Sequence, residues 1–297
     1  MDINQLKTFY HVAKNASFTK AAYKLCITQP AVTSQIKSLE GNLRTCLFRR
    51  IGRKIFLTHE GKILLEYARK IINLEKEIKT IFTELSGLQK GKIILGATRV
   101  IGTYFLPQKL GQFRAKYPQI GILTRIENST QVMNFLLEGE VDLAISGKTD
   151  DLNKNLEARL YHTEKLVLIT SPQSKIAKEQ KISLEKLSNY QFFFREEGTK
   201  TRQITDEWIK ANGVFNNTSF EVGNVEAVKR LVEEDFGITL IPEIAVKREV
   251  ELGLLKIIDI PELDLKIDYY LMCIKDRKCS KALSTFTDFL FPKPVKH

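Results

Sequence analysis

The sequence contains few of the residues from which disulfides and metal sites are built. Its 297 residues include four Cys, four His and one Trp. The cysteines form no C-x-x-C pair, and no histidine stands at metal-ligand spacing from them. We therefore expect ordinary reduced thiols and no metal, while a redox or metal role for Cys273 and Cys279 stays open as the alternative.

Motifs of the common enzyme classes are also missing. The chain has no G-x-S-x-G, no P-loop, no H-E-x-x-H and no G-x-G-x-x-G after a predicted strand. Its histidines belong to separate predicted elements, at His11, His59, His162 and His297. No base or nucleophile assembles from them, so the sequence predicts a protein that is not an enzyme and needs no cofactor.

Long hydrophobic runs are absent too. No segment approaches the roughly 18 apolar residues of a membrane span. The opening "MDINQLKTFYHVAKN" is amphipathic and lacks the apolar centre of a signal peptide. A protein that binds anionic membrane would want a basic amphipathic anchor or a lipidation signal, and neither is evident. We expect a cytoplasmic protein with no membrane partner.

Positive charge is abundant, and it is concentrated at the N-terminus. Of a formal net charge of +11, residues 1–90 contribute +9, from 16 Lys and Arg against 7 Asp and Glu. Such a concentration is typical of a surface that binds a polyanion. The length of the chain favours two or three domains.

The segment "SFTKAAYKLCITQPAVTSQIKSLEG", residues 17–41, predicts two short helices joined by a tight corner. A first helix, about residues 2–14, precedes them. Pro30 fits the first turn of the later helix, where its missing N–H costs nothing, and Thr28 can cap that helix. This is the arrangement of a helix-turn-helix.

The last of these helices would enter the major groove of DNA. Gln can pair with adenine, Thr and Ala can contact thymine methyl groups, and Ser or Lys can reach phosphates or bases. Some of these side chains could instead be merely solvated, because sequence alone does not fix how the helix is rotated in the groove. The candidates are Gln29, Pro30, Ala31, Thr33, Ser34, Gln35 and Lys37.

The segment "LFRRIGRKIFLT", residues 47–58, predicts a basic β-hairpin, or wing. Ile55 and Leu57 alternate with Lys54 and Phe56, and Gly52 stands where a turn is needed. Clustered cations beside a helix-turn-helix can bind phosphates. The phosphate-binding candidates are Arg49, Arg50, Arg53 and Lys54.

These motifs carry a family resemblance. "LKTFYHVAKNASFTKAAYKLCITQPAVTSQIKSLEGNLRTCLFRR" followed by "LTHEGKILLEYA" resembles the DNA-binding region of LysR-type transcriptional regulators over about 65 residues. Two positions depart from the family pattern, which usually has Gly at position 44 and often Pro at position 46. With Arg44 in place of Gly, a left-handed conformation there would cost the side chain about 1 kcal/mol.

A heptad pattern follows Thr58, which is a predicted N-cap. Apolar residues recur at alternating spacings of three and four, which is typical of a helix packed against another helix. They are Leu64, Tyr67, Ile71, Leu74, Ile78, Ile81, Leu85 and Leu88. Burial within one chain is the alternative, but we favour self-association, and the resemblance implies that this helix forms the dimer. A dimer with two DNA-binding domains then predicts an inverted-repeat DNA site.

From Lys92 onward, predicted strands alternate with predicted helices, as in "KIILGAT", "FLPQKLGQFRAKYP" and "IGILTRIEN". A later strand, "EKLVLITSP", begins at Glu164. The pattern predicts two α/β lobes around a cleft. It resembles the effector-binding domain of the same family, which is similar to type 2 periplasmic solute-binding proteins.

The predicted fold class is therefore α/β with an N-terminal winged helix-turn-helix. We expect three parts: a DNA-binding domain, a dimerising linker helix and an effector-binding domain of two lobes. Their ranges are 1–58, 59–90 and 91–297, with lobe I about 91–162 and 265–297 and lobe II about 163–264.

Polar residues follow three of the predicted strands, where sheets of this kind bind ligands beside helix N-termini. Each Ser or Thr alone could be only an N-cap, but the topology implied by the resemblance brings the three strand ends to one cleft. The candidates are Thr98, Arg99, Asn128, Ser129, Thr130, Thr199 and Thr201. The resemblance matches Thr98, Ser129 and Thr199 or Thr201 to effector-holding positions. If Arg99 faces the cleft, an effector bearing a carboxylate, sulfate or phosphate is favoured.

The sequence thus predicts a cytoplasmic, bacterial, effector-responsive LysR-type regulator that binds double-stranded promoter DNA. The resemblance implies a homodimer or homotetramer, and RNA polymerase is a further candidate partner. A solute-binding receptor without a transcriptional role is the alternative, and an enzyme is the last choice. The effector, the target genes and the sign of regulation do not follow from the sequence.

Overall fold

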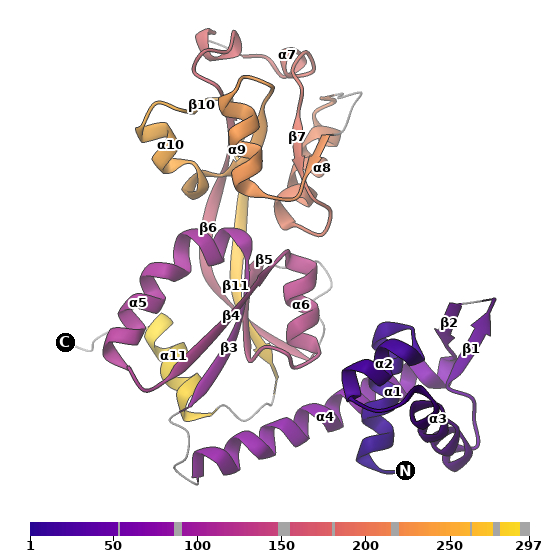
Figure 1. Ribbon diagram of the computed structural model, residues 1–297. Coiled ribbons are helices and arrows are strands. Elements are labelled where there is room, and N and C mark those ends of the chain that lie inside the picture. Colours follow the sequence, from indigo (N-terminus) through magenta and orange to yellow (C-terminus); the bar gives the residue numbers. More distant parts are fainter. Residues whose placement is uncertain are drawn as a thin grey trace. The chain divides into compact units, whose positions relative to one another are not determined.

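The computed structural model describes most of the chain, as residues 1–52, 54–85, 91–147, 155–179, 182–214, 220–261, 263–275 and 280–291. The chain divides into two compact units, Met1–Gln89 and Lys90–His297. Figure 1 shows helices and a two-stranded hairpin in the first unit and mixed α/β structure in the second.

The N-terminal unit has three short helices, a hairpin and a long helix. They are α1 (Ile3–Asn15), α2 (Phe18–Leu25), α3 (Gln29–Leu43), β1 (Phe48–Ile51), β2 (Lys54–Leu57) and α4 (His59–Leu85). Apolar side chains of the helices form one core, which includes the fully buried Phe9, Val32 and Leu39. The predicted helix-turn-helix and wing are both present.

The corner between α2 and α3 explains the proline within this helical sequence. Cys26 ends α2 in the left-handed conformation, with φ 54°. The Thr28 hydroxyl accepts a hydrogen bond from the Ala31 N–H at 3.3 Å, and Pro30 lies in the first turn of α3. The prediction that the proline starts a helix is confirmed.

The wing is an antiparallel hairpin that pairs Phe48 with Leu57 and Ile51 with Lys54. Gly52 turns the chain between its strands with φ +59°. The Glu40 carboxylate, near the end of α3, accepts hydrogen bonds from the Leu47 and Phe48 N–H groups at 2.7 and 3.3 Å. This carboxylate fixes the base of the wing to α3.

The second unit contains a long twisted sheet with helices on its faces. Its strands are β3 (Lys92–Thr98), β4 (Gly121–Glu127), β5 (Leu143–Gly147), β6 (Leu156–Thr170), β7 (Phe193–Arg195), β8 (Phe220–Val222), β9 (Thr239–Pro242), β10 (Lys256–Ile258) and β11 (Lys266–Ile274). Its α-helices are α5 (Leu106–Lys116), α6 (Ser129–Leu137), α7 (Leu184–Leu187), α8 (Lys200–Ala211), α9 (Val225–Glu233), α10 (Lys247–Glu251) and α11 (Lys281–Leu290). Three further turns are η1 (Ile101–Phe105), η2 (Ile176–Lys178) and η3 (Glu243–Ala245).

The strand order β10-β6-β11-β5-β3-β4 places β6 in both lobes. From Leu156 to Lys165 this strand pairs with β11, and from Leu166 onward it pairs with β9 and β10. The prediction that a strand begins at Glu164 was wrong by eight residues, because β6 already begins at Leu156. Residues 156–163 are mostly polar or half-exposed and do not show the apolar run of a buried strand.

In the first lobe, helices cover both faces of the sheet (Figure 1). Ile93, Leu95 and Ala97 share a core with α5 and α11. Ile94 packs on the other face, where α6 supplies Val132 and Leu136. Because side chains alternate along a strand and both faces are covered, β3 has no charged side chain from Ile93 to Ala97.

In the second lobe, β9 and β10 pair with the far half of β6, while β7 and β8 form a separate pair. The strands β7 and β8 are parallel, and a bridge between Phe192 and Ile238 joins β7 to β9. Trp208 of α8 packs into the core of this lobe. The carboxyl ends of β3, β4 and β7 lead to the polar segments that the sequence singles out.

Arg44, which ends α3, adopts the left-handed conformation considered in the sequence analysis. This residue has φ 52° and ψ 38°, in the left-handed region. We predict that Arg44→Gly raises the free energy of unfolding of the N-terminal unit by about 1 kcal/mol, because glycine has no Cβ to strain there. Calorimetric unfolding of the full chain measures the change.

Asn42→Gly is the matched control for this substitution, because Asn42 is exposed but lies within the right-handed last turn of α3. Glycine at that position should lower stability by a few tenths of a kcal/mol. A loss of stability in both variants would contradict the account of Arg44.

Candidate nucleic-acid interface and effector cleft

The predicted recognition residues lie in the first half of α3, and most are accessible. Gln29, Pro30, Ser34 and Lys37 are exposed, while Ala31, Thr33 and Gln35 are half-buried. Three of them already have hydrogen-bond partners. The Gln29 amide donates to the Thr33 hydroxyl at 2.9 Å, and Gln35 accepts a hydrogen bond from Thr8 of α1. The latter contact holds the Gln35 side chain toward the helical core.

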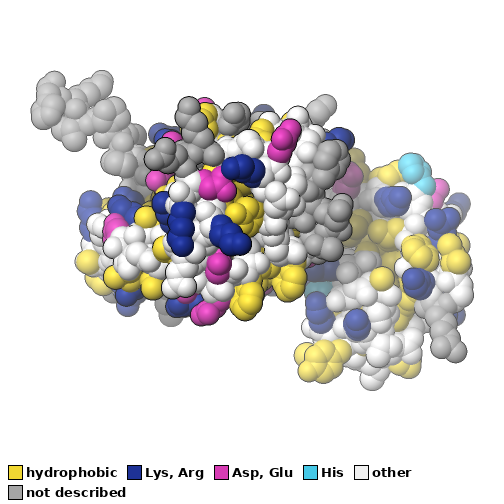
Figure 2. Space-filling view, turned by 90° about the horizontal axis from the view of Figure 1, so that it is seen from above, with side chains coloured by type: hydrophobic (Ala, Val, Ile, Leu, Met, Phe, Trp, Pro, Cys, Tyr) yellow, Lys and Arg dark blue, Asp and Glu magenta, His cyan; other side chains and the backbone are white. Residues whose placement is uncertain are grey.

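The wing presents its cations on both of its faces. Arg49, Arg50 and Lys54 are exposed, and Lys and Arg side chains stand out on the molecular surface in Figure 2. Arg49 and Arg50 are successive residues of β1, so they point to opposite faces. The Arg50 guanidinium lies 5.6 Å from the centre of the Phe18 ring. The fourth candidate, Arg53, lies outside the described residues.

The heptad positions of α4 differ in their surroundings. Leu64 packs against the core of the N-terminal unit. Tyr67, Ile71, Leu74 and Ile78 are all exposed, Leu74 to 56%. They form an apolar stripe on α4, called the α4 stripe below. The side chains of Ile81 and Leu85, and all of Leu88, lie outside the described part of the chain.

A small cavity of about 20 Å³ lies between the two lobes of the second unit. Residues from both lobes line it: Thr98, Arg99, Val100, Asn128, Ser129, Arg195, Thr199, Lys200, Thr201, Ile267 and Tyr269. Six of the seven predicted effector residues are thus brought together. The seventh, Thr130, lies beside the cavity and donates its N–H to the Gly198 carbonyl at 3.1 Å.

Two helix N-termini meet at this cavity. Asn128 caps α6 by accepting the Gln131 N–H at 2.9 Å, and Thr199 caps α8 by accepting the Arg202 N–H at 3.2 Å. Ser129, in the first turn of α6, is 4% exposed. The positive ends of both helix dipoles therefore favour an anion between the lobes.

Thr98, the last residue of β3, carries a hydroxyl that the described chain leaves without a hydrogen-bond partner. Its Oγ1 is buried, and the residue is 7% exposed. Burying a hydroxyl without a partner costs about 1–3 kcal/mol, and such groups are rare in native structures. A ligand in this cavity could satisfy the Thr98 hydroxyl as donor or acceptor.

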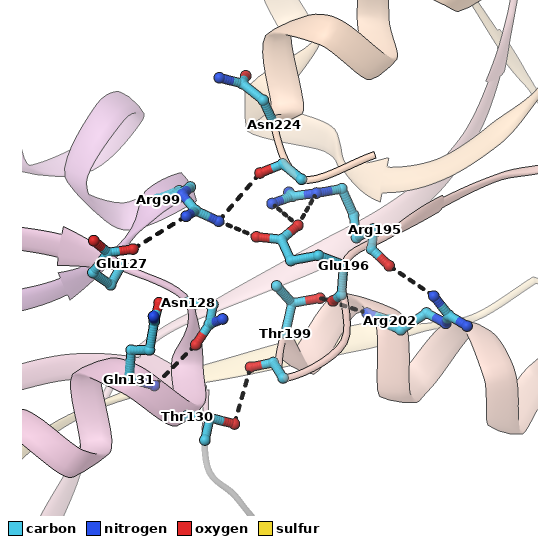
Figure 3. A network of polar contacts seen from close by, with 12 residues as sticks. Arg99, Glu127, Asn128, Thr130, Gln131, Arg195, Glu196, Thr199, Arg202 and Asn224 are labelled. Carbon is cyan, nitrogen blue, oxygen red and sulfur yellow. Dashed lines mark hydrogen bonds and ion pairs between the residues drawn. The ribbon is translucent and has the colours of Figure 1, made fainter. Parts of the chain in front are cut away.

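Arg99 faces the cleft and contacts three groups there (Figure 3). One nitrogen donates to Glu127 at 3.1 Å; the other contacts Glu196 and donates to the Gly223 carbonyl at 3.2 Å. Glu196 also accepts two hydrogen bonds from Arg195, at 3.0 and 2.8 Å. Since Arg99 belongs to the first lobe and Glu196 to the second, these contacts form a polar clasp between the lobes.

A second contact between the lobes lies along α9. The Tyr104 hydroxyl donates to Glu226, which Lys229 also contacts at 3.0 Å. The Lys229 side chain is 3% exposed and reaches Glu249 at 2.7 Å. Burial raises the pKa of Glu226, but the hydrogen bonds from Tyr104 and Lys229 outweigh it and leave this pKa below its ordinary value.

Sequence reasoning missed several cavity residues. Arg195 lines the cavity, and Glu196 is hydrogen-bonded to it; both stand in "FFFREEG", where the charges directly after an apolar strand were an available signal. Ile267 and Tyr269 come from β11, far along the chain, and no local pattern marks them. Burial raises the pKa of the Tyr269 phenol, which therefore stays neutral and can donate a hydrogen bond.

The described residues offer neither a metal-binding cluster nor a membrane-spanning helix. Among the described residues, no group of three or more His, Cys, Asp or Glu side chains is placed to hold a metal ion. Of the two cysteines considered for a redox or metal role, Cys273 is half-buried and Cys279 lies outside the described residues. No helix in the described part of the chain is long and apolar enough to span a membrane.

Two family models match this chain. The bacterial regulatory helix-turn-helix model of the lysR family matches residues 3–62. The LysR substrate binding domain model matches residues 86–293.

Curated relatives match along nearly the whole chain. The HTH-type transcriptional activator CmpR of Synechocystis is 35% identical over 289 residues, covering 97% of this chain and 94% of the relative. A probable RuBisCO transcriptional regulator of Cyanidioschyzon merolae is 32% identical, covering 96% and 95%.

Solved structures agree on the fold. A full-length OxyR variant from Pseudomonas aeruginosa has a TM-score of 0.69 at 18% identity, covering 98% of this chain and 94% of that one. The CcmR regulatory domain of Synechocystis PCC6803, in complex with 2-PG, has a TM-score of 0.63 at 26% identity, covering 68% and 96%. CbnR complexed with its target DNA has a TM-score of 0.62 at 20% identity, covering 98% and 99%.

Proposed function

The chain belongs to the LysR family of transcriptional regulators, and on that premise we propose that a small anionic effector, bound between the lobes, modulates its binding to promoter DNA. Its relatives are transcriptional regulators and not enzymes, and regulators of this family bind promoter DNA and small-molecule effectors. One observation carries the proposal: two helix N-termini and the unpartnered Thr98 hydroxyl converge on one cavity.

The proposed division of labour follows the chain. Residues 1–58 bind DNA, residues 59–90 pair two chains, and residues 91–297 bind the effector. A DNA-binding protein works where the chromosome is, so we place this regulator in the cytoplasm. The alternative of a solute-binding receptor has no support from relatives that are regulators over 94–95% of their own length.

At the DNA, α3 reads bases and the wing binds phosphates. Ser34 and Lys37 are exposed and available to bases or phosphates, and Gln29 becomes available to adenine when it releases Thr33. Arg49, Arg50 and Lys54 supply positive charge to the sugar-phosphate backbone, as Arg53 does in this proposal.

Removal of a wing cation tests the DNA interface. We predict that Lys54→Ala weakens binding to all duplexes and lowers the slope of log affinity against log salt by about 1 for each bound chain, or about 2 for a dimer, because each chain loses one phosphate contact. Arg53→Ala should act in the same way, whereas Gln29→Ala should relax the preference at particular bases. Fluorescence anisotropy at several salt concentrations measures both effects.

Lys109→Ala is the matched control, since Lys109 is an exposed lysine of α5 in the other unit. Its slope should equal that of the wild type. An unchanged slope in Lys54→Ala would place the wing away from DNA.

The α4 stripe supports self-association. A row of exposed apolar side chains at heptad spacing on a charged helix is stabilised when a second helix covers it. A dimer would then present two recognition helices to an inverted-repeat site. A measurement of the molecular mass in solution also distinguishes a dimer from a tetramer.

Charge placed in the α4 stripe should separate the chains. We predict that Leu74→Glu combined with Ile78→Glu gives a monomer at micromolar concentration, because a dimer would bury these carboxylates between its two α4 helices. Light scattering after size exclusion measures the mass. Lys62→Glu, on the same helix outside the α4 stripe, should remain associated, and a monomeric wild-type chain would overturn the proposal.

The effector class follows from the chemistry of the cleft. Helix N-termini, Arg99, Arg195 and Lys200 all favour negative charge, and the structurally similar CcmR regulatory domain was solved with 2-PG. The cavity of about 20 Å³ has room for little more than a water molecule. An effector therefore requires the lobes to open or its lining side chains to move.

The Thr98 hydroxyl tests the effector site. A thermal-shift screen of small anions, 2-PG included, first identifies a stabilising compound. We predict that Thr98→Val, like Ser129→Ala, abolishes the effect of this compound on DNA affinity while the affinity without it is unchanged. Thr98→Ser keeps the hydroxyl and should keep the response. Loss of DNA binding in Thr98→Val would instead indicate damaged folding, and a full response would remove Thr98 from the site.

A further inference from the structure

The carboxylate of Glu196 is held between two arginines at the edge of the cavity. Its Oε2 accepts hydrogen bonds from Nε and Nη2 of Arg195, whose side chain is 3% exposed. Its Oε1 contacts Arg99 across the cleft. Figure 3 shows Glu196 lying between the two guanidinium groups. Both oxygens of a single carboxylate thus have a cationic partner, which is the strongest class of hydrogen bond available to them.

Arg99 and Arg195 are also both among the residues that line the cavity where the helix N-termini of α6 and α8 meet. An anionic effector and Glu196 would therefore use the same donors. Glu196 has the advantage of being tethered, since its carboxylate loses little freedom when it pairs with Arg195, the preceding residue. An effector has to offer more charge or more hydrogen bonds than one carboxylate to take its place.

We propose that Glu196 is an internal competitor of the effector and determines its specificity. The side chain occupies the two arginines when the cleft holds no anion, and an effector binds by displacing it from Arg99. The cleft then selects a multiply charged anion, such as a phosphate monoester or a dicarboxylate, over a monocarboxylate. This inference rests on the anionic effector proposed above.

The same displacement would change how the lobes are connected. Arg99 is the residue of the first lobe that contacts both Glu196 and the Gly223 carbonyl of the second. Gly223 stands directly before Asn224, the N-cap of α9. A ligand that takes Arg99 away from Glu196 therefore alters the clasp between the lobes, and a ligand can shift such a balance only through its different affinity for the two arrangements.

The neighbouring residue provides a matched control. Glu197 has the same charge and is exposed, and the described structure gives it no hydrogen bond or ion pair. Glu197→Gln removes one negative charge at nearly the same place without touching either arginine. Any difference between Glu196→Gln and Glu197→Gln therefore reports the contact with the arginines and not the net charge of the loop.

Inorganic phosphate is the probe, titrated at constant ionic strength into the full chain by calorimetry. Trp208, the single tryptophan, lies on α8, whose first turn lines the cavity, so its fluorescence gives a second signal. We expect Glu196→Gln to bind phosphate about tenfold more tightly than the wild type, because a charge-assisted competitor is lost. Glu197→Gln should bind like the wild type.

A double variant shows whether a gain in phosphate affinity comes from Arg99 or from a general loss of rigidity in the cleft. In Glu196→Gln combined with Arg99→Met, the gain should disappear, since the freed guanidinium is its cause. Equal affinities of the wild type, Glu196→Gln and Glu197→Gln would overturn the role of Glu196 and leave an anionic effector in place. No phosphate binding by any of the three would overturn both, and a gain that survives Arg99→Met would overturn the displacement from Arg99.

Discussion

The electrostatics of one cleft govern what this regulator can sense. Two helix N-termini and the guanidinium groups of Arg99 and Arg195 place positive potential between the lobes, and the carboxylates of Glu127 and Glu196 offset much of it. Burial makes each of these charges costly unless it is paired. The cleft therefore holds paired charges of both signs, and under the proposal made above an added anion takes the place of a carboxylate that is already there.

Both units use helix caps to fix the positions of their elements, but the caps serve a different purpose in each. In the N-terminal unit, caps such as Thr28 and the pairing of Glu40 with the wing backbone fix the angles between small elements. In the second unit, the caps Asn128 and Thr199 stand at the cavity, so residues that begin helices also shape the ligand site. Because the capping oxygens accept from backbone N–H groups of the first helical turn, they fix the direction in which each helix N-terminus faces the cavity.

Local sequence signals predicted the helix-turn-helix and the wing, and together with the topology implied by the family resemblance they predicted six of the residues that line the cavity. Pro30, Gly52 and Thr199 each require a specific backbone feature, and each was found where its chemistry demands it. Contacts between distant segments were not predictable, as with Glu196 against Arg99 or Tyr269 in the cavity wall. The first half of β6 was missed because its side chains are not sorted into an apolar run, although its backbone is paired with β11.

That continuous strand has a mechanical consequence. β6 spans 15 residues and carries ladder hydrogen bonds in both lobes, with one register shift opposite Tyr269 and Tyr270. Such a strand resists stretching and sharp bending because either would break hydrogen bonds, but twisting it a few degrees per residue preserves them. Torsion about β6 therefore disturbs fewer hydrogen bonds than stretching it does, so rotation of one lobe against the other is the way in which this strand allows the cleft to open.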